Sequence, residues 1–592
     1  MLLDVGSVLL ESVAVDGRPG KRLLFRDPVR VIEARSVADV PAALLAVDRA
    51  LAEGLSVAGF VGYEAGLALE SVLAALVPEP LDGEPLLWLG CYRSSESVEN
   101  SLSEVAESSV QAVRLSLTEV EYVSRVEAVQ RLIAAGETYQ ANLTMEACWQ
   151  AGESAEALYQ RLLQAQPVEY AALLRPQAAW HVLSFSPELF FRRDGERIVT
   201  RPMKGTAAPG VDMAETRAQA AWLQADEKNR AENVMIVDLL RNDLGRICKI
   251  GSVKATELFH VERYPTVLQM TSTVEGRLRD GVGYAEIFRA LFPSGSIVGA
   301  PKVQTMRRLW ELEARRRGVY TGAIGYITPD GQAEFNVAIR TVSLRGQEAR
   351  MGVGSGIVAD SVAELEYAEC KTKLAFLTLP AIEPFSLIET LLVENGAYTL
   401  LPEHLERMAE SAEYFGMVFD GERVQKALRE ALQEAGNERR RVRLLLDREG
   451  VASWSSTALP TPSEEPVDLL LWPQRTQAND LFLRHKTTRR ALYDQAFQAA
   501  QAAGCADALF LNEDGEVTEG AIHNVVVVLN GGWLTPPLAS GVLPGVFRRK
   551  LLDVGRVTER RLTREHLEQA EEIYLCNSVR GLRRVRELRP PV

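Results

Sequence analysis

A stretch bracketed by two prolines, LTLPAIEPFS, most limits what this sequence can fold into. Pro380 and Pro384 enclose an extended segment that follows a helical run ending near residues 375–377. Proline does not continue a helix, so such a stretch marks a break between folded parts. A chain of 592 residues is also longer than one compact core usually grows. We therefore predict two units, residues 1–378 and 385–592, joined by a linker at 379–384.

The composition is that of a globular protein, with 47% hydrophobic and 25% charged residues. Charged residues interrupt every apolar run before the roughly 18 residues that a membrane span needs. The opening MLLDVGSVLLESV lacks the basic leading region of a signal peptide. Six scattered cysteines without a CxxC pair fit a reducing compartment. We expect a cytoplasmic protein with no membrane partner.

The net charge of -14 argues against a nucleic-acid partner. An anionic small molecule would have to be held by local lysines and arginines that work against this background. Basic residues close to glycine-rich loops are therefore candidates for a binding site.

Both predicted units mix helical and strand-like patterns, which indicates an α+β fold. In the first unit, residues 182–185 are strand-like, and Tyr122 to Ala135 has the apolar spacing of a helix that Gly136 ends. The second unit has the following predicted elements: helices at 403–414 and 424–435, and strands at 442–446 and 467–472. The polar stretch 474–480 suggests a joint between two subdomains.

Four acids and two lysines stand out in the first unit. Glu188 in SFSPELFF and Lys204 in RPMKGT are close enough in sequence for two strands to fold back and bring them together. Glu232 lies on the apolar face of a predicted helix, where a buried carboxylate needs a partner or a cation. Glu366, Glu369 and Lys373 recur at spacings of three and four in another helix.

Carboxylates from two helices that meet at one point would suit Mg²⁺, which prefers oxygen ligands. By spacing alone, ordinary solvated helix faces explain the same residues equally well. The glycines of GVGSGIVADS allow a backbone to approach a carboxylate closely, although a simple turn would also use them. Their spacing is not GxGxxG, which excludes a nicotinamide site of that type.

The ordered motifs of the first unit resemble the chorismate-using family that includes anthranilate synthase, isochorismate synthase and aminodeoxychorismate synthase component I. The matching segments are GETYQANLT, SPELFF, RPMKGT, DEKNRAENVMIVDLLRNDLGRI, FPSGSIVGAPK, YTGAIGY, FNVAIRT, GVGSGIV and EYAECKTK. They run from about Gly136 to Lys373. The resemblance implies a large α+β unit with two sheets around a central cleft.

The resemblance also implies a metal and substrate site. Glu232 and Glu369 would carry Mg²⁺, with Glu366 close by, and the ion would hold the ring carboxylate of chorismate. The enolpyruvyl side chain and its carboxylate would be held by four groups: Arg340, Tyr326, Lys373 and the backbone at Gly354.

Within this family Lys204 favours the aminodeoxychorismate branch, because anthranilate synthases resemble this stretch but carry a small residue there. The implied mechanism has the lysine amine add to ring carbon 2 and expel the 4-hydroxyl, after which ammonia enters at carbon 4. Glu188 would be the general acid that helps the hydroxyl leave. Without the resemblance, a surface lysine in a turn is the more ordinary interpretation of Lys204.

Three further features qualify the resemblance. Gln269 occupies a position where several family members have histidine, and glutamine can replace it only by hydrogen bonding. No glutaminase signature occurs, so ammonia would come from solution or from a separate glutamine amidotransferase subunit. Residues 9–12, LLES, resemble part of the family's tryptophan-binding segment, but four residues do not predict inhibition.

The second unit resembles the fold-type IV pyridoxal-phosphate enzymes, on the segments PEHLERM, LRHKTTRR, VTEGAIHNVVVV and SGVLPGVFRR. By that match Lys486 binds the cofactor covalently, and Glu519 pairs with its pyridinium nitrogen. The phosphate would be held by Arg407, the backbone at Val546 and Phe547, and Ser578. Taken alone, Lys486 and Glu519 could equally form a salt bridge. Enzymes of this type are often dimers, so a homodimer through this unit is a further expectation.

The cofactor residues do not separate a lyase from a transaminase. Thr390 in LIETLL falls where aminodeoxychorismate lyase has a catalytic threonine, although transaminases also carry an ET pair there. The fusion favours the lyase, because the product of the first unit would be its substrate. The resemblance thus implies a bifunctional enzyme that makes 4-aminobenzoate and pyruvate from chorismate and ammonia. The alternatives are a branched-chain or D-amino-acid aminotransferase as the second unit, or one unit acting only as a scaffold.

Overall fold

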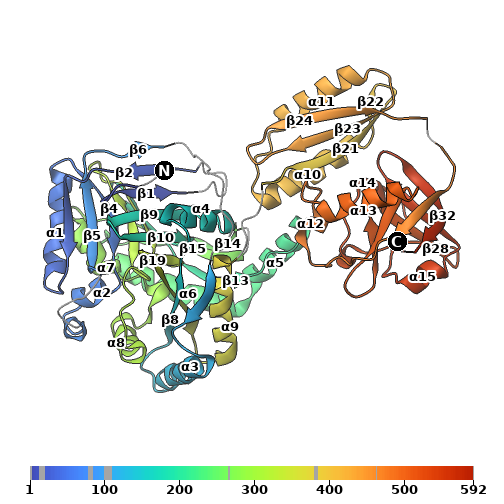
Figure 1. Cartoon of the computed structure of the whole chain (residues 1–592). Helices are drawn as coiled ribbons and strands as arrows, with labels where there is room; N and C mark the ends of the chain where they lie inside the picture. Colours follow the sequence, from blue (N-terminus) through green and yellow to red (C-terminus); the bar gives the residue numbers. More distant parts are fainter. Residues whose placement is uncertain are drawn as a thin grey trace. The chain divides into compact units, whose positions relative to one another are not determined.

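The computed structural model describes residues 3–12, 20–77, 84–98, 110–264, 267–378, 384–461 and 463–590. The chain separates into two compact units (Figure 1): Met1–Ala208 with Ala220–Ile382, and Pro209–Gln219 with Glu383–Val592. The predicted linker at 379–384 lies outside the described residues except for Pro384. Among the helices that can be described, none is long and apolar enough to cross a membrane.

The first unit contains two large sheets whose strands pair antiparallel. In the order of the sheet, the first contains β16 (Gly299–Ala300), β8 (Gln140–Gln150), β20 (Glu348–Ile357), β19 (Thr341–Arg345), β10 (Trp180–Ser186), β9 (Tyr170–Gln177), β1 (Val8–Glu11), β2 (Arg22–Phe25) and β6 (Glu96–Ser97), with β7 (Gln111–Leu115) beside β8.

The second sheet of this unit contains β13 (Met203–Ala207), β15 (Val267–Arg277), β12 (Arg197–Arg201), β11 (Leu189–Asp194), β18 (Ala333–Val337), β17 (Ala323–Ile327), β4 (Ser56–Val61), β5 (Leu87–Tyr92) and β3 (Arg30–Ala34), with β14 (Lys254–Tyr264) beside β15. β11 and β12 form a hairpin with Leu189 opposite Arg201. This is the fold-back that the spacing of Glu188 and Lys204 predicts.

The helices of the first unit cover these sheets (Figure 1): α1 (Asp39–Ala52), α2 (Glu64–Leu69), α3 (Glu119–Ala134), α4 (Ala155–Ala165), α6 (Glu227–Gly245), α7 (Tyr284–Leu291), α8 (Lys302–Glu313) and α9 (Ala363–Leu374), while α5 (Met213–Ala225) crosses the boundary of the two units. α3 begins three residues before the predicted start because Thr118 and Glu121 form a capping box. Its predicted apolar face is buried, with Val126 and Val129 in the core beside α4 and α9.

The second unit begins with a four-stranded sheet in the order β22 (Ala397–Tyr398), β21 (Leu387–Glu394), β23 (Arg440–Leu446) and β24 (Ala452–Ala458). Helices α10 (Leu401–Phe415) and α11 (Gly421–Ala435) pack against it through a shared apolar core (Figure 1). The two helices and the first strand predicted from the sequence of this part lie within α10, α11 and β23.

An eight-stranded sheet completes the second unit. It contains β27 (Val517–Gly520), β26 (Asp507–Leu511), β25 (Val467–Leu471), β32 (Gly581–Arg589), β31 (Glu572–Asn577), β28 (Asn524–Leu529), β29 (Gly532–Thr535) and β30 (Thr558–Glu559). Its helices are α12 (Leu481–Arg484), α13 (Ala491–Ala502), α14 (Val546–Asp553) and α15 (Arg564–Glu568). Because β25 already belongs to this sheet, the passage between subdomains lies before Val467, earlier than the predicted joint at 474–480.

Candidate functional site

Lys204 lies in a β-bulge at the edge of the second sheet. Met203 pairs with Thr271 and Thr206 with Gln269, so β13 carries one residue more than β15 over this interval. Gly205 has a φ of +96°, which favours glycine. A bulge can redirect a side chain that a regular strand would point elsewhere. The half-buried Lys204 side chain reaches Gly356 on β20 of the other sheet, where a Cβ would lie 2.7 Å from Nζ.

The amine of Lys204 lies among charged groups from several elements. Burial lowers its pKa below the ordinary lysine value, and Lys373 acts in the same direction. The carboxylates of Glu232, Glu369 and Glu188 oppose this shift. The structure therefore brings together five residues that the sequence nominates separately.

Glu188 is a buried carboxyl group in the loop between β10 and β11. It is 4% exposed, and the hydroxyl of Ser296 donates a hydrogen bond to its Oε1 at 2.5 Å. Burial raises its pKa to about 7, against the opposing effects of Ser296 and Lys204. A carboxyl group with such a pKa is protonated in part of the protein near neutrality, as a general acid requires.

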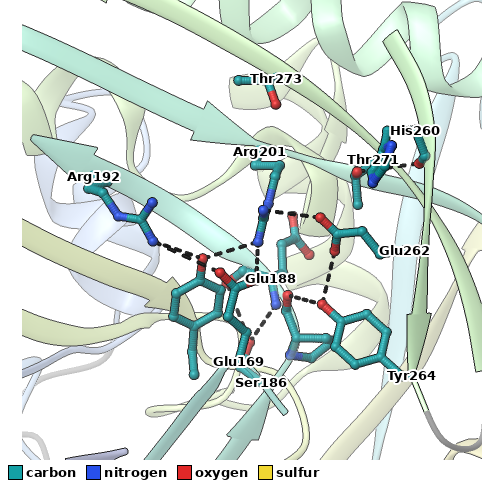
Figure 2. A network of polar contacts seen from close by, with 12 residues as sticks. Glu169, Ser186, Glu188, Arg192, Arg201, His260, Glu262, Tyr264, Thr271 and Thr273 are labelled. Atoms are coloured by element: carbon teal, nitrogen blue, oxygen red, sulfur yellow. Dashed lines mark hydrogen bonds and ion pairs between the residues drawn. The ribbon is translucent and has the colours of Figure 1, made fainter. Parts of the chain in front are cut away.

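A buried ionic network is centred on Arg201 (Figure 2). Arg201, at the end of β12, contacts Glu169 and also Glu262, the latter at 3.0 Å. The hydroxyl of Tyr264 lies 3.0 Å from Glu262 and 3.4 Å from the carbonyl of Pro187. The network joins the strand that leads to Lys204 with the loop that carries Glu188, and so fixes both.

The predicted metal ligands come from α6 and α9. Glu369 is ion-paired with Lys373 at 2.6 Å. Glu232 and Glu366 both raise the pKa of Lys228, so the carboxylates of the two helices face a common region. Within the described ranges no three such side chains form a ready metal-binding group. The donor set still fits Mg²⁺, which often takes one or two carboxylates and fills its remaining positions with water and substrate oxygens.

Two cationic groups could receive a carboxylate. Lys373 donates to the carbonyl of Gly354 at 2.9 Å. Arg340 has a φ of +51° and forms no ion pair with any carboxylate in the described part of the chain. Burial lowers its pKa to about 10, which leaves it charged at neutral pH. An unpaired, desolvated arginine is a strong candidate for binding an anion.

Tyr326 is not brought together with these residues. It lines a separate small cavity with Leu10, Glu11 and Ser12 of the LLES segment, and its ring lies 5.9 Å from that of Phe25. No described contact joins it to Lys204, Arg340 or the acids, so its predicted role gains no support from the geometry.

Sequence reasoning missed two residues of this site. Gln140 is fully buried on β8, its side-chain amide has no hydrogen-bond partner among the described residues, and its Nε2 also lies 2.7 Å from the Cβ position of Gly356. The second residue, Ser296, donates a hydrogen bond to Glu188. Both occur inside matched motifs, GETYQANLT and FPSGSIVGAPK. Polarity at a buried strand position was the available signal for Gln140, but nothing in the local sequence marked Ser296.

The second unit has a cavity of about 660 Å³ lined by Lys486, Glu519, Arg407 and Thr390. Lys486 lies between α12 and α13, and its carbonyl accepts from Ile388 of β21 at 2.8 Å. No ion pair or hydrogen bond holds its amine among the residues described. Burial, with Arg407 and Arg490 nearby, lowers the pKa of Lys486 to about 8. Such an amine is readily deprotonated and can attack a carbonyl carbon.

Glu519, at the end of β27, is 4% exposed and accepts three hydrogen bonds. The donors are Leu543 N–H at 3.1 Å, the Tyr493 hydroxyl at 3.1 Å and the Asn524 amide at 3.0 Å. Burial raises its pKa to about 7 despite these donors. A fixed carboxyl group of this kind can share a proton with a ring nitrogen.

The proposed phosphate ligands surround another part of this cavity. Val546 and Phe547 begin α14, whose N-cap Gly545 supplies no side-chain hydrogen bond. Uncapped N–H groups at a helix start suit a phosphate. Ser578 also lines the cavity. Arg407 is held by Glu389 through hydrogen bonds of 2.8 and 2.7 Å. A lysine without a partner, a buried carboxyl group and a phosphate cradle together fit pyridoxal phosphate.

Thr390 lies on the face of the four-stranded sheet that lines the cavity. It pairs directly with Arg443 of β23, and Arg441 lies two residues along the same face. Arg441, Arg443 and Arg580 all line the cavity, and none forms an ion pair with a carboxylate in the described residues. The sequence analysis missed these arginines, although the alternation of Arg441 and Arg443 with the buried Val442 and Leu444 was a visible signal for those two.

Comparison with known proteins matches both units to families. Residues 15–379 match the chorismate binding enzyme family, and residues 386–588 match the amino-transferase class IV family. The chain is 40% identical over 266 residues to aminodeoxychorismate synthase component 1 of Bacillus subtilis, covering 45% of this chain and 56% of that protein. It is 42% identical over 257 residues to an anthranilate synthase component 1 of Haloarcula marismortui, covering 43% and 52%.

The chain thus spans about half the length of these curated relatives. The crystal structure of anthranilate synthase component I from Streptococcus pneumoniae superposes with a TM-score of 0.53 at 26% identity, covering 62% of this chain and 94% of that one. These matches confirm the predicted fold class and the predicted fusion of two enzyme families. The chain belongs to the chorismate binding enzyme family, and its C-terminal residues 386–588 match the amino-transferase class IV family.

Proposed function

We propose that the chain is a bifunctional enzyme of 4-aminobenzoate formation. Its first unit would convert chorismate and ammonia to 4-amino-4-deoxychorismate, and its second unit would remove pyruvate from that product. One observation carries the proposal: the Lys204 amine is desolvated beside Glu188 and near the acids of α6 and α9. The curated relatives include an aminodeoxychorismate synthase component 1 and an anthranilate synthase component 1. A lysine at this position favours the former.

In the first step, Nζ of Lys204 forms a bond to ring carbon 2. Both ring double bonds shift, from C1=C2 and C5=C6 to C1=C6 and C4=C5, and the bond from carbon 4 to its hydroxyl breaks. Glu188 supplies the proton with which the hydroxyl leaves as water, and it takes up the proton that the bonded amine loses. Ammonia then bonds to carbon 4, both double bonds shift back, and Lys204 leaves carbon 2 as an amine with the proton that Glu188 returns.

The substrate would be held by groups of the first sheet and of α9. Arg340, directly before β19, has no competing carboxylate among the described residues, and Lys373 of α9 can donate to an anion beside the backbone of Gly354. Glu232 and Glu369, with Glu366 close by, would hold Mg²⁺, which supplies charge neutralisation at the ring carboxylate of chorismate.

The second unit would act with pyridoxal phosphate, whose ring takes up negative charge from a carbon next to the bound amine. The amine of Lys486 removes the proton from carbon 4 of the substrate, while Glu519 holds a proton at the ring nitrogen. Thr390 lies on the same cavity face as Arg443, in reach of a polar substrate. The carbon–oxygen bond to pyruvate breaks, and formation of the aromatic ring drives the reaction.

Ammonia would be delivered by a separate glutamine amidotransferase subunit. The designation component 1 of the relatives implies a further component for those proteins. A homodimer through the second unit stays a prediction. Chorismate is the substrate of the first unit, and the amine made from it is the substrate on which the second unit acts.

The test is product identification. Purified protein is incubated with chorismate, ammonium and Mg²⁺, with and without pyridoxal phosphate. We expect 4-amino-4-deoxychorismate without the cofactor, and 4-aminobenzoate with an equal amount of pyruvate when it is present. Anthranilate as the product would overturn the assignment of the first unit. Transamination of leucine or D-alanine with 2-oxoglutarate, without release of pyruvate from the chorismate product, would overturn that of the second.

In the same assay, Lys204→Ala should abolish the 4-amino product, while Lys249→Ala, at a partly exposed lysine of the same unit that is paired with Glu196, should not. Full activity of Lys204→Ala would remove the nucleophile from the proposal.

A further inference from the structure

The bulge that carries Lys204 rests on a weakly held strand. β13 is only five residues long, forms the edge of its sheet and pairs on one side alone, with β15. Its regular pairing is interrupted between Met203 and Thr206, where Lys204 and Gly205 lie opposite a single residue of β15. Edge strands with few ladder hydrogen bonds open easily. Something beyond the ladder must therefore hold this bulge in one conformation.

The side chain of Gln269 provides that support. Its Nε2 donates a hydrogen bond of 3.3 Å to the carbonyl of Gly205, the residue directly after Lys204. Gln269 is 8% exposed, so little water competes for this contact. Gly205 is the bulge residue with the left-handed backbone, and its carbonyl orientation depends on that conformation.

Gln269 is itself firmly anchored. It lies in β15, which pairs with β13 on one side and with β14 on the other, and its partners are Thr206 and Glu262. The 11 residues of β15 and of β14 form a long ladder. The amide therefore extends from a strand that is fixed on both sides to a bulge that is fixed on one.

We propose that Gln269 is a positioning residue that holds the Lys204 bulge through its hydrogen bond to Gly205. The side chain thus acts on the lysine through the backbone of the bulge. The inference rests on the proposed function only in calling Lys204 the nucleophile.

The variants Gln269→Met and Gln269→Glu separate positioning from packing. Methionine keeps the length of the side chain but cannot donate, and an ionised glutamate would present an oxygen to the Gly205 carbonyl. Gln304→Met is the matched control, because Gln304 also donates from Nε2, to Glu137 at 3.1 Å, but on α8. Loss of one net hydrogen bond predicts a decrease in kcat of about three- to tenfold.

Two measurements test the inference. The first is kcat and KM for chorismate with ammonium as the nitrogen source: we expect kcat to fall in both variants while KM and the melting temperature stay near wild type. The second is hydrogen–deuterium exchange without substrate: we expect faster exchange in residues 203–207 and unchanged exchange in β14 and in the part of β15 beyond Gln269. Wild-type kcat in both variants, or equal loss of stability across the unit, would overturn the inference.

Failure of the proposed function and failure of the inference about Gln269 can be told apart, because hydrogen–deuterium exchange is measured without turnover of substrate. Faster exchange at the bulge in a protein whose wild type does not aminate chorismate would overturn the proposed function and leave the support by Gln269 standing. Unchanged exchange in variants of a protein that does aminate chorismate would overturn the role of Gln269 alone.

Discussion

The amine of Lys204 on one sheet lies against the α-carbon of Gly356 on the other, so closely that a Cβ there would stand 2.7 Å from Nζ. The absence of a side chain at position 356 therefore has a steric cause: it leaves the space that the lysine amine occupies. The same position faces Nε2 of the buried Gln140.

Gly356→Ala should displace Lys204 without unfolding the unit, because the atoms in the way are the ends of two long side chains. We expect the rate of the 4-amino product to fall about 100-fold, since small misplacement of a reacting group is costly. The control is Gly245→Ala at the end of α6, where nothing lies within 4 Å of the added carbon. Initial rates with ammonium measure both. A rate unchanged in Gly356→Ala would show that the lysine acts from elsewhere.

The rate of amination should fall as the pH rises through about 7. Burial raises the pKa of Glu188 to about 7, and only the protonated form can donate to the leaving hydroxyl, so the active fraction decreases above this pH. Lys204 must be deprotonated, which gives the opposite trend at lower pH. Glu188→Gln should lose the alkaline decrease and slow the reaction about 10²- to 10⁴-fold. A pH–rate profile of kcat tests this, and an alkaline decrease that persists in Glu188→Gln would assign it to another group.

Lys486→Ala should remove the visible absorbance of lysine-bound cofactor and stop pyruvate release, while amination continues. Lys486 lines the cavity, and burial lowers the pKa of its amine to about 8, so that it can bind the cofactor. Lys550→Ala, at an exposed position of α14, is the control. Absorbance spectra after addition of pyridoxal phosphate measure the effect. A band retained by Lys486→Ala would mean that a different lysine binds the cofactor.

Glu389→Gln should destabilise the second unit by about 3–5 kcal/mol, because it leaves the buried Arg407 without its charge partner. Burial would raise the pKa of Glu389, but Arg407 and His404 hold it at about 2. Since this pKa is depressed, the pair contributes stability above about pH 4.5 that is lost as the pH falls toward 2. Denaturant titrations of the second unit, with release of the cofactor as the signal of unfolding, measure this free energy. In Glu389→Gln the free energy of unfolding should depend less on pH in that acid range. An equal pH dependence would contradict the assignment of this stability to the Glu389–Arg407 pair.

The sequence predicted elements with strong periodicity and missed what depends on distant partners. The helices at 403–414 and 424–435 were found because their apolar spacing is regular and they pack on one sheet. The joint at 474–480 was misplaced because polar composition marks loops but not which sheet a strand joins. At the site, Lys204 and Glu188 could be nominated by motif. Their support by Ser296, Gln269 and the Arg201 network could not, because those contacts depend on tertiary pairing.

The ammonium group of Lys373 is tied to two oxygens, one from Glu369 and one from Gly354. A divalent cation that binds Glu369 would take away one of these partners and free a positive charge for an incoming carboxylate. Metal and substrate would then favour each other's binding by thermodynamic linkage, even without direct contact between them. The Glu369–Lys373 ion pair would therefore leave the lysine less available to an anion until the metal has bound.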